Sequence, residues 1–127
     1  MRCLLVDDNE PFIEAARVLL MKQGIDVVGA ASTGAEAFRL VGELRPDVVL
    51  VDIDLGGESG FELTRRLTEE ASRAVSSVIL ISTHSEVDYA DLIAASPAIG
   101  FLPKSHLSAE AIHKLLGGDR GNEPVRT

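Results

Sequence analysis

The sequence has few aromatic residues: no tryptophan, one tyrosine and four phenylalanines among 127 residues. Because 46% of the residues are hydrophobic and only 4% are aromatic, the core must be built mainly from aliphatic side chains. A chain of this length is ordinary for one domain with its own hydrophobic core. We therefore expect a single globular domain without internal repeats.

Cysteine is nearly absent as well, with Cys3 as its one example. A disulfide within the chain is therefore excluded, and the apolar neighbours of Cys3 predict a buried hydrophobic role for its thiol. No apolar run approaches the roughly 20 residues that a membrane-spanning helix needs. No signal peptide is visible, because the apolar run after Arg2 ends at the acidic pair Asp7-Asp8. These absences predict a soluble, cytoplasmic protein.

Basic residues are outnumbered, with 12 Lys and Arg against 20 Asp and Glu and a net charge of -8. Binding to a nucleic-acid backbone needs clustered Lys and Arg side chains. We therefore expect no direct nucleic-acid binding by this chain. The surplus of carboxylates also suggests that some of them converge where a cation is needed.

Five short apolar runs recur at nearly regular intervals along the chain. They are residues 3–6, 26–30, 48–51, 78–81 and 99–102. Each has the length of a strand and none alternates with polar residues. This pattern is typical of parallel strands that are covered on both faces of the sheet.

Between these runs, apolar residues recur at helical spacing. Phe12, Ala16 and Leu19 mark the first helix, and Thr33 with Glu36 forms a capping box before the second. The later stripes and caps are Ala37, Leu40, Val41 and Leu44; Phe61, Thr64 and Leu67; Ser85 with Asp88, then Leu92 and Ile93; and Ser108 with Ile112, Leu115 and Leu116. Five alternations of strand and helix predict an α/β fold in which helices cover both faces of a parallel sheet.

Polar residues stand at the carboxyl ends of the predicted strands, the edge at which open α/β sheets bind ligands. They are Asp7 and Asp8 after the first strand, Asp52 after the third, Ser82 after the fourth and Lys104 after the fifth. Each alone has an ordinary explanation as a cap, a turn residue or a surface charge. Together they place three carboxylates, a hydroxyl and an ammonium at one edge of one sheet.

Three neighbouring carboxylates repel one another by roughly a kcal/mol or more per pair, even with strong screening. A hard cation with oxygen ligands, such as Mg²⁺, removes that cost. Asp52 follows four apolar residues and is placed as a nucleophile that accepts a phosphoryl group. Mg²⁺ and Lys104 would neutralise the equatorial oxygens of that group, and the Ser82 hydroxyl would donate to one of them.

This ordered set resembles the receiver domains of two-component response regulators over residues 1–117. The matching residues are Asp7, Asp8, Asp52, Gly60, Ser82 and Lys104. The resemblance implies a flavodoxin-like (βα)5 doubly wound parallel sheet with strand order 2-1-3-4-5. Residues 118–127 would then form a flexible tail.

The resemblance also implies a magnesium site. Asp8 would bind Mg²⁺ directly and Asp7 through water, while Asp52 and the backbone carbonyl of Asp54 would complete the protein ligands. These assignments rest on the family pattern and on the matching positions of this sequence.

By the same resemblance, Ser82 and Phe101 are switch residues and Lys104 pairs with the phosphoryl group. Asp54 and His84 lie two residues beyond the acceptor and the switch serine. Such positions flank the route of attacking water in this family, so we expect both residues to set the lifetime of the phosphorylated form.

Three positions depart from the common family pattern. Gly56 stands where the family often has Pro, and Ser105 follows Lys104 where many members have Pro. Because cis peptide bonds are essentially confined to proline, the usual cis bond after the lysine is not expected. Phe101 lacks the hydroxyl of the more frequent Tyr, so its signal would be steric.

The resemblance implies a sensor histidine kinase or a small phosphodonor as the source of the phosphoryl group, and no reaction beyond the chain's own phosphorylation and dephosphorylation. The output surface would be the fourth helix, fifth strand and fifth helix, roughly residues 87–116. It would bind an unidentified downstream protein or form a homodimer. Similar receivers precede helix-turn-helix domains, and too few residues follow Gly117 for one. Residues 117–127 are either the tail of a receiver that acts alone, which we expect, or the start of a linker to a further domain.

Two other functions stay open. Asp52-Ile53-Asp54 has the D-x-D spacing of haloacid-dehalogenase phosphatases, but their D-x-D lies on the first strand and their acidic pair comes last. Here the acidic pair comes first. The second alternative is a receiver-like scaffold that acts through protein contacts without phosphorylation. The intact set of acidic residues argues against it.

Overall fold

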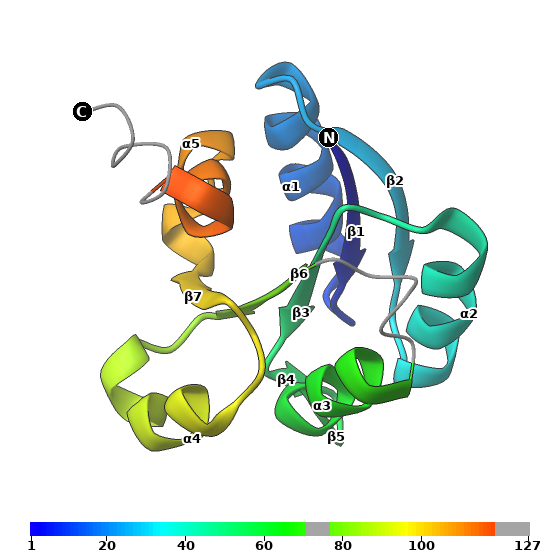
Figure 1. Ribbon diagram of the computed structural model, residues 1–127. Helices are drawn as coiled ribbons and strands as arrows, with labels where there is room; N and C mark the ends of the chain where they lie inside the picture. The colour runs from blue at the N-terminus through cyan, green and yellow to red at the C-terminus, as the bar shows by residue number, and fades with distance from the viewer. Residues whose placement is uncertain (71–76, 119–127) are drawn as a thin grey trace.

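The computed structural model describes residues 1–70 and 77–118 of the chain. Five parallel strands form one sheet in the order β2-β1-β3-β6-β7 (Figure 1). They are β1 (Arg2–Val6), β2 (Asp26–Ala31), β3 (Val48–Asp52), β6 (Ser77–Ser82) and β7 (Gly100–Pro103). Counted along the sequence, this is the predicted order 2-1-3-4-5. The labels differ because two extra two-residue strands, β4 (Asp54–Leu55) and β5 (Glu58–Ser59), form a separate hairpin.

Helices cover both faces of the sheet, as predicted. One face packs against α1 (Glu10–Lys22) and α5 (Ala109–His113), and the other against α2 (Gly34–Leu44), α3 (Gly60–Glu70) and α4 (Ala90–Ala95) (Figure 1). Short helical turns complete the fold: η1 (Glu86–Tyr89), η2 (Lys104–His106) and the π-helical η3 (Lys114–Gly118). None of the helices in the described ranges is long and apolar enough to cross a membrane. Of the predicted tail, residues 119–127 lie outside the described residues.

The sheet separates two aliphatic cores. Successive residues of a strand point to opposite faces, so Leu4 and Val6 join one core while Cys3 and Leu5 join the other. Cys3 is fully buried as predicted, and this burial raises the pKa of its thiol to about 12. Phe101 is the one buried aromatic side chain in the described parts of the chain. The aliphatic core expected from the composition is therefore confirmed.

Two helix details differ from the predictions. In α1 the sheet-facing residues are Ala16 and Leu20, four apart, whereas Leu19 is 36% exposed. The buried apolar stripe of α1 therefore follows the i, i+4 row. Leu19, which the spacing predicted at i+7, lies at the solvent edge of this stripe. Ser85 precedes the separate turn η1, where its hydroxyl lies 3.4 Å from Asp88 Oδ2 and caps no backbone N–H. The fourth α-helix therefore begins later than predicted.

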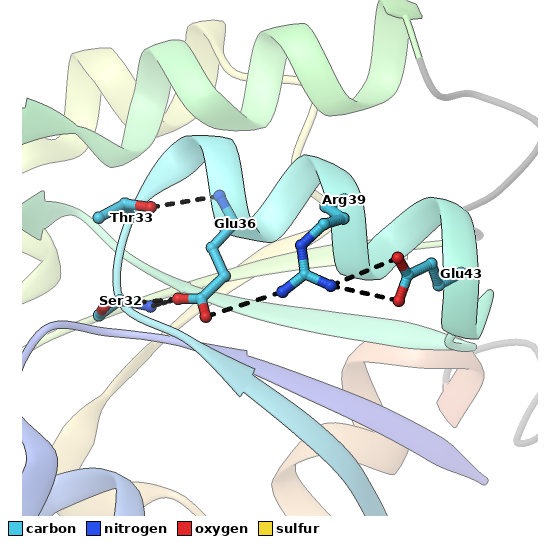
Figure 2. Close-up of polar contacts among 5 residues, drawn as sticks. All are labelled: Ser32, Thr33, Glu36, Arg39 and Glu43. Atoms are coloured by element: carbon cyan, nitrogen blue, oxygen red, sulfur yellow. Dashed lines mark hydrogen bonds and ion pairs between the residues drawn. The ribbon is translucent and has the colours of Figure 1, made fainter.

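The predicted capping box opens α2 (Figure 2). Thr33 Oγ1 accepts a hydrogen bond from Glu36 N at 3.2 Å, and the Glu36 carboxylate accepts one from Ser32 N at 3.0 Å. In the standard box that second bond comes from the N-cap residue itself, one position later.

Farther along α2, both carboxylate oxygens of Glu43 lie 3.3 Å from Arg39 Nη1. Such exposed pairs contribute only about 0.2–0.5 kcal/mol each, so burial holds α2 in place.

Candidate functional site

Three carboxylates meet at the carboxyl edge of the sheet. Asp7 and Asp8 follow β1, and Asp52 ends β3, which pairs directly with β1. One oxygen of each carboxylate lies within 4.8 Å of the other two. Asp7 is fully buried and Asp52 is 6% exposed, whereas Asp8 faces solvent. This all-oxygen donor set suits a hard divalent cation.

Lys104 reaches the same place from the end of β7. Its Nζ lies 2.7 Å from Asp7 Oδ2 and 3.3 Å from Asp52 Oδ2, and its side chain is only 10% exposed. Asp7 Oδ2 is buried and makes no hydrogen bond to the described residues beyond this ion pair. The pocket holds three carboxylates and one ammonium, which contacts two of them, so it carries an excess of negative charge.

The acceptor predicted from the sequence has a strongly shifted acidity. The pKa of Asp52 is raised to about 6, chiefly by burial and next by the negative charge of Asp7. The backbone N–H of Asp54, 3.2 Å from Asp52 Oδ1, and the Lys104 ammonium act in the opposite direction. The ionised form of Asp52 is therefore destabilised in this pocket when no further cation is bound.

Gly60 fixes the approach of α3 to Asp52. Its N–H donates to Ile53 O at 2.7 Å, and a Cβ at Gly60 would lie 2.1 Å from the carbonyl oxygen of Asp52. Only glycine permits this contact between the start of α3 and the end of β3. The position therefore holds the backbone of Asp52 in place.

The hairpin β4–β5 explains why this chain has Gly56 where the family often has Pro. Gly56 and Gly57 form its two-residue turn with φ values of +58° and +104°, and proline cannot adopt a positive φ. A Cβ at Gly56 would also lie 2.5 Å from Asp8 Oδ2. On the far side of the turn, Glu58 Oε1 accepts a hydrogen bond from Gly34 N at 2.8 Å, which joins the hairpin to α2.

The structure places the remaining predicted residues near this edge but not in the carboxylate cluster. Ser82 is buried at the end of β6, and its Oγ accepts a hydrogen bond from His84 N at 3.0 Å. Phe101 is buried in β7, directly opposite Leu80 of β6. Asp54 is exposed at the start of β4, and His84 is exposed in the loop after β6. The His84 ring meets Tyr89 edge-on, with centroids 5.8 Å apart.

Sequence reasoning missed one neighbour of the site, Phe12. It was expected in the core, but its half-buried ring also lies 4.5 Å from Lys104 Nζ. The available signal was its place in the first helical turn after the acidic pair, since that turn begins at the same edge of the sheet.

The peptide bond between Lys104 and Ser105 is trans, as expected.

Comparison with known proteins places these features in a family. The model of the response regulator receiver domain matches residues 3–116. The transcriptional regulatory protein LiaR of Bacillus subtilis (strain 168) is 31% identical over 128 residues, which cover 100% of this chain and 60% of LiaR. The transcriptional activator protein ExaE of Pseudomonas putida is 35% identical over 123 residues, covering 93% of this chain and 56% of ExaE. The chain thus spans little more than half the length of these relatives.

Solved structures show the same architecture. The signal receiver domain of the putative response regulator NarL from Mycobacterium tuberculosis superposes with a TM-score of 0.75 at 30% identity, covering 91% of this chain and 92% of that one. The signal receiver domain of a modulated diguanylate cyclase from Desulfovibrio desulfuricans G20 gives a TM-score of 0.75 at 28% identity, with 99% and 98% covered. Both similarities extend over nearly the whole described chain.

Proposed function

The chain belongs to the family of response-regulator receiver domains, and from that premise we propose that it is a phosphorylation-dependent signalling switch whose acceptor is Asp52. The observation that carries this proposal is the grouping of Asp52 with Asp7, Asp8 and Lys104 at one sheet edge. The donor would be a sensor histidine kinase or a small phosphodonor. The chain would catalyse only its own phosphorylation and dephosphorylation.

The acidic cluster fits Mg²⁺. All its donor atoms are carboxylate oxygens, and the buried Asp7 Oδ2 makes only its ion pair with Lys104 among the described residues. Asp7, Asp8 and Asp52 would hold the ion, and the resemblance adds the backbone carbonyl of Asp54. When bound, Mg²⁺ would offset the repulsion between the carboxylates and neutralise charge on the phosphoryl oxygens.

The chain's own groups divide the transfer between them. A carboxylate oxygen of Asp52 attacks the phosphorus, and the bond between phosphorus and the leaving group of the donor breaks. Lys104, already 3.3 Å from Asp52 Oδ2, pairs with a phosphoryl oxygen as it arrives. Ser82 Oγ accepts the N–H of His84, so its own hydroxyl proton is oriented away from that bond and can be donated to another phosphoryl oxygen.

The signal would pass from Ser82 to the neighbouring strand and helix. Phe101 lies in β7, which pairs with the strand that carries Ser82. A shift of Ser82 toward the phosphoryl group would free space for the Phe101 ring and bias the α4–β7–α5 surface between two arrangements. That surface would contact an unidentified downstream protein or a second copy of the chain.

We propose that Asp54 and His84 set the lifetime of the phosphoryl group on Asp52. Both are exposed, and each lies two residues beyond a residue of the reaction. The family resemblance implies that these positions flank the route of attacking water. Substitution of either by Ala should change the rate of dephosphorylation. Unchanged rates in both variants would remove this assignment without affecting the acceptor.

The test is intact-mass measurement after incubation with Mg²⁺ and acetyl phosphate, beside Asp52→Ala. We expect one added phosphoryl group in the wild type, dependent on Mg²⁺ and absent from the variant. No addition under conditions that label an ordinary receiver would favour the phosphorylation-independent scaffold. Repeated turnover of a phosphate ester would favour a phosphatase.

A further inference from the structure

Phe12 is held in a fixed position at the start of α1. The side chain of Asn9 caps this helix by accepting a hydrogen bond from Phe12 N at 3.1 Å, and Pro11 precedes it in the first turn. The ring is half-buried and packs against the core that contains Leu5 and Ile112. Cap and core together determine where the face of the ring points.

That face lies against the ammonium of Lys104. Nζ is 4.5 Å from the ring centroid, within the range of a cation–π interaction, while the same atom contacts Asp7 and Asp52. A lysine side chain has a long flexible stem and no fixed donor geometry. With the side chain only 10% exposed, the ring occupies a side of the ammonium that water would otherwise take.

The ring differs chemically from the other two neighbours of the ammonium. It attracts a cation but has no lone pair that takes an N–H in the way a carboxylate does. An ammonium has three N–H donors, and two carboxylates contact it here. The ring therefore holds Lys104 at the acceptor and leaves a donor for an arriving phosphoryl oxygen.

We propose that Phe12 is a positioning residue for phosphorylation, which it supports by holding Lys104 Nζ beside Asp52. This assignment rests on the proposed function. In the transfer from acetyl phosphate, a bond forms between an Asp52 carboxylate oxygen and phosphorus while the bond from phosphorus to the acetyl oxygen breaks and acetate leaves. Lys104 keeps its proton and all its covalent bonds, and Phe12 touches neither the donor nor the acceptor.

The experiment compares Phe12→Leu and Phe12→Tyr in phosphorylation by acetyl phosphate at saturating Mg²⁺. Loss of the ring should lower the maximal rate about three- to tenfold with KM for acetyl phosphate little changed, whereas Phe12→Tyr keeps the ring and should stay within about twofold of the wild type. Phe38→Leu is a matched control, because Phe38 is also half-buried beneath a cation, with Arg66 Cζ 4.7 Å from its ring centroid, but on α2. It should keep the wild-type rate.

A second readout does not depend on phosphorylation. The ring current of Phe12 should move the NMR signals of the Lys104 ε-methylene protons upfield in the wild type and in Phe12→Tyr, and this shift should disappear in Phe12→Leu. Ordinary Lys104 signals in the wild type, or an equal loss of rate when Phe12→Leu is made in a Lys104→Gln background, would overturn the assignment. If the ring-current shift is present but the rate of Phe12→Leu is unchanged, the positioning role is wrong and the proposed function stands. A wild type that accepts no phosphoryl group would instead contradict the proposed function.

Discussion

The helices on the two sides of Asp52, α2 with α3 on one side and η1 with α4 on the other, are attached to the sheet in different ways. α2 and α3 bury aliphatic side chains completely or nearly so, among them Val41, Leu63 and Leu67. By contrast, neither η1 nor α4 contains a buried residue, and Val87 and Leu92 are 82% and 54% exposed. Since buried apolar contacts set the cost of local opening, the α4 side can move at lower cost than the α2–α3 side. The loosely attached part is the one that the proposed switch would displace.

The largest expected effect comes from breaking the firm attachment of α3. Gly60→Ala would place a Cβ 2.1 Å from the carbonyl oxygen of Asp52. The backbone must move to relieve this clash, so we expect a loss of about 3–5 kcal/mol in the free energy of unfolding, measured by urea denaturation.

Gly42→Ala is the control for this change. Gly42 lies inside α2 and is exposed, and a Cβ added there would meet nothing within 4 Å. Alanine there should stabilise the protein by about 0.5–1 kcal/mol through its higher helix propensity. Equal effects of the two substitutions would contradict the close contact at Gly60.

Leucine-to-alanine substitutions in α3 and α4 test directly how firmly each helix is attached to the sheet. Leu67 in α3 is fully buried, and Leu67→Ala should cost about 2–5 kcal/mol through lost burial and a cavity. Leu92 in α4 is more than half exposed, so Leu92→Ala should change the free energy of unfolding by less than about 0.5 kcal/mol. Thermal and urea unfolding of both variants measure the difference. A large loss in Leu92→Ala would mean that α4 is anchored as firmly as α3.

The ionisation of Asp52 should make stability depend on pH. The pKa of Asp52 is about 6 in the folded chain against an ordinary value of 3.8, so the folded state binds this proton more tightly. The resulting penalty on folding is absent below pH 3.8, grows as the pH rises, and is complete above pH 6. Without divalent cations, Asp52→Asn should therefore raise the free energy of unfolding at pH 7.5 by about 1–3 kcal/mol. The gain should shrink toward pH 4; a constant gain would contradict this origin.

A smaller gain in stability is expected from a buried hydroxyl within α3. Thr64 is fully buried and its Oγ1 has no hydrogen-bond partner in the described structure, so Thr64→Val should stabilise the protein by about 1 kcal/mol. Thr68, one turn later, donates its hydroxyl to Thr64 O at 3.0 Å. Thr68→Val should therefore give no comparable gain in thermal unfolding. A destabilised Thr64→Val would reveal a partner for that hydroxyl.

The main fold and the acidic cluster were predictable for one physical reason. Uninterrupted apolar runs identify covered parallel strands, and the residues that follow such strands must share one edge, which brought together Asp7, Asp52 and Lys104. The hairpin β4–β5 was not predicted because two-residue strands carry no periodicity. The positive φ values of Gly56 and Gly57 in the structure show that the turn requires glycine.

Other details depended on tertiary contacts that a spacing pattern does not contain. The choice between Leu19 and Leu20 as the core residue of α1 follows from how the helix is rotated against the sheet. The contact between the Phe12 ring and Lys104 joins residues far apart in the sequence, and apolar spacing accounts for Phe12 as a core residue alone.

The central claim is that phosphorylation of Asp52 acts on the weakly attached α4 side. Its most direct test is hydrogen exchange, followed by peptide mass spectrometry, on the protein with Mg²⁺ before and after full phosphorylation by acetyl phosphate. We predict one phosphoryl group on the peptide that contains Asp52, with changed exchange over Glu86–Tyr89, Ala90–Ala95 and Gly100–Pro103 and little change over Gly34–Leu44. Complete phosphorylation with unchanged exchange over η1, α4 and β7 would contradict it.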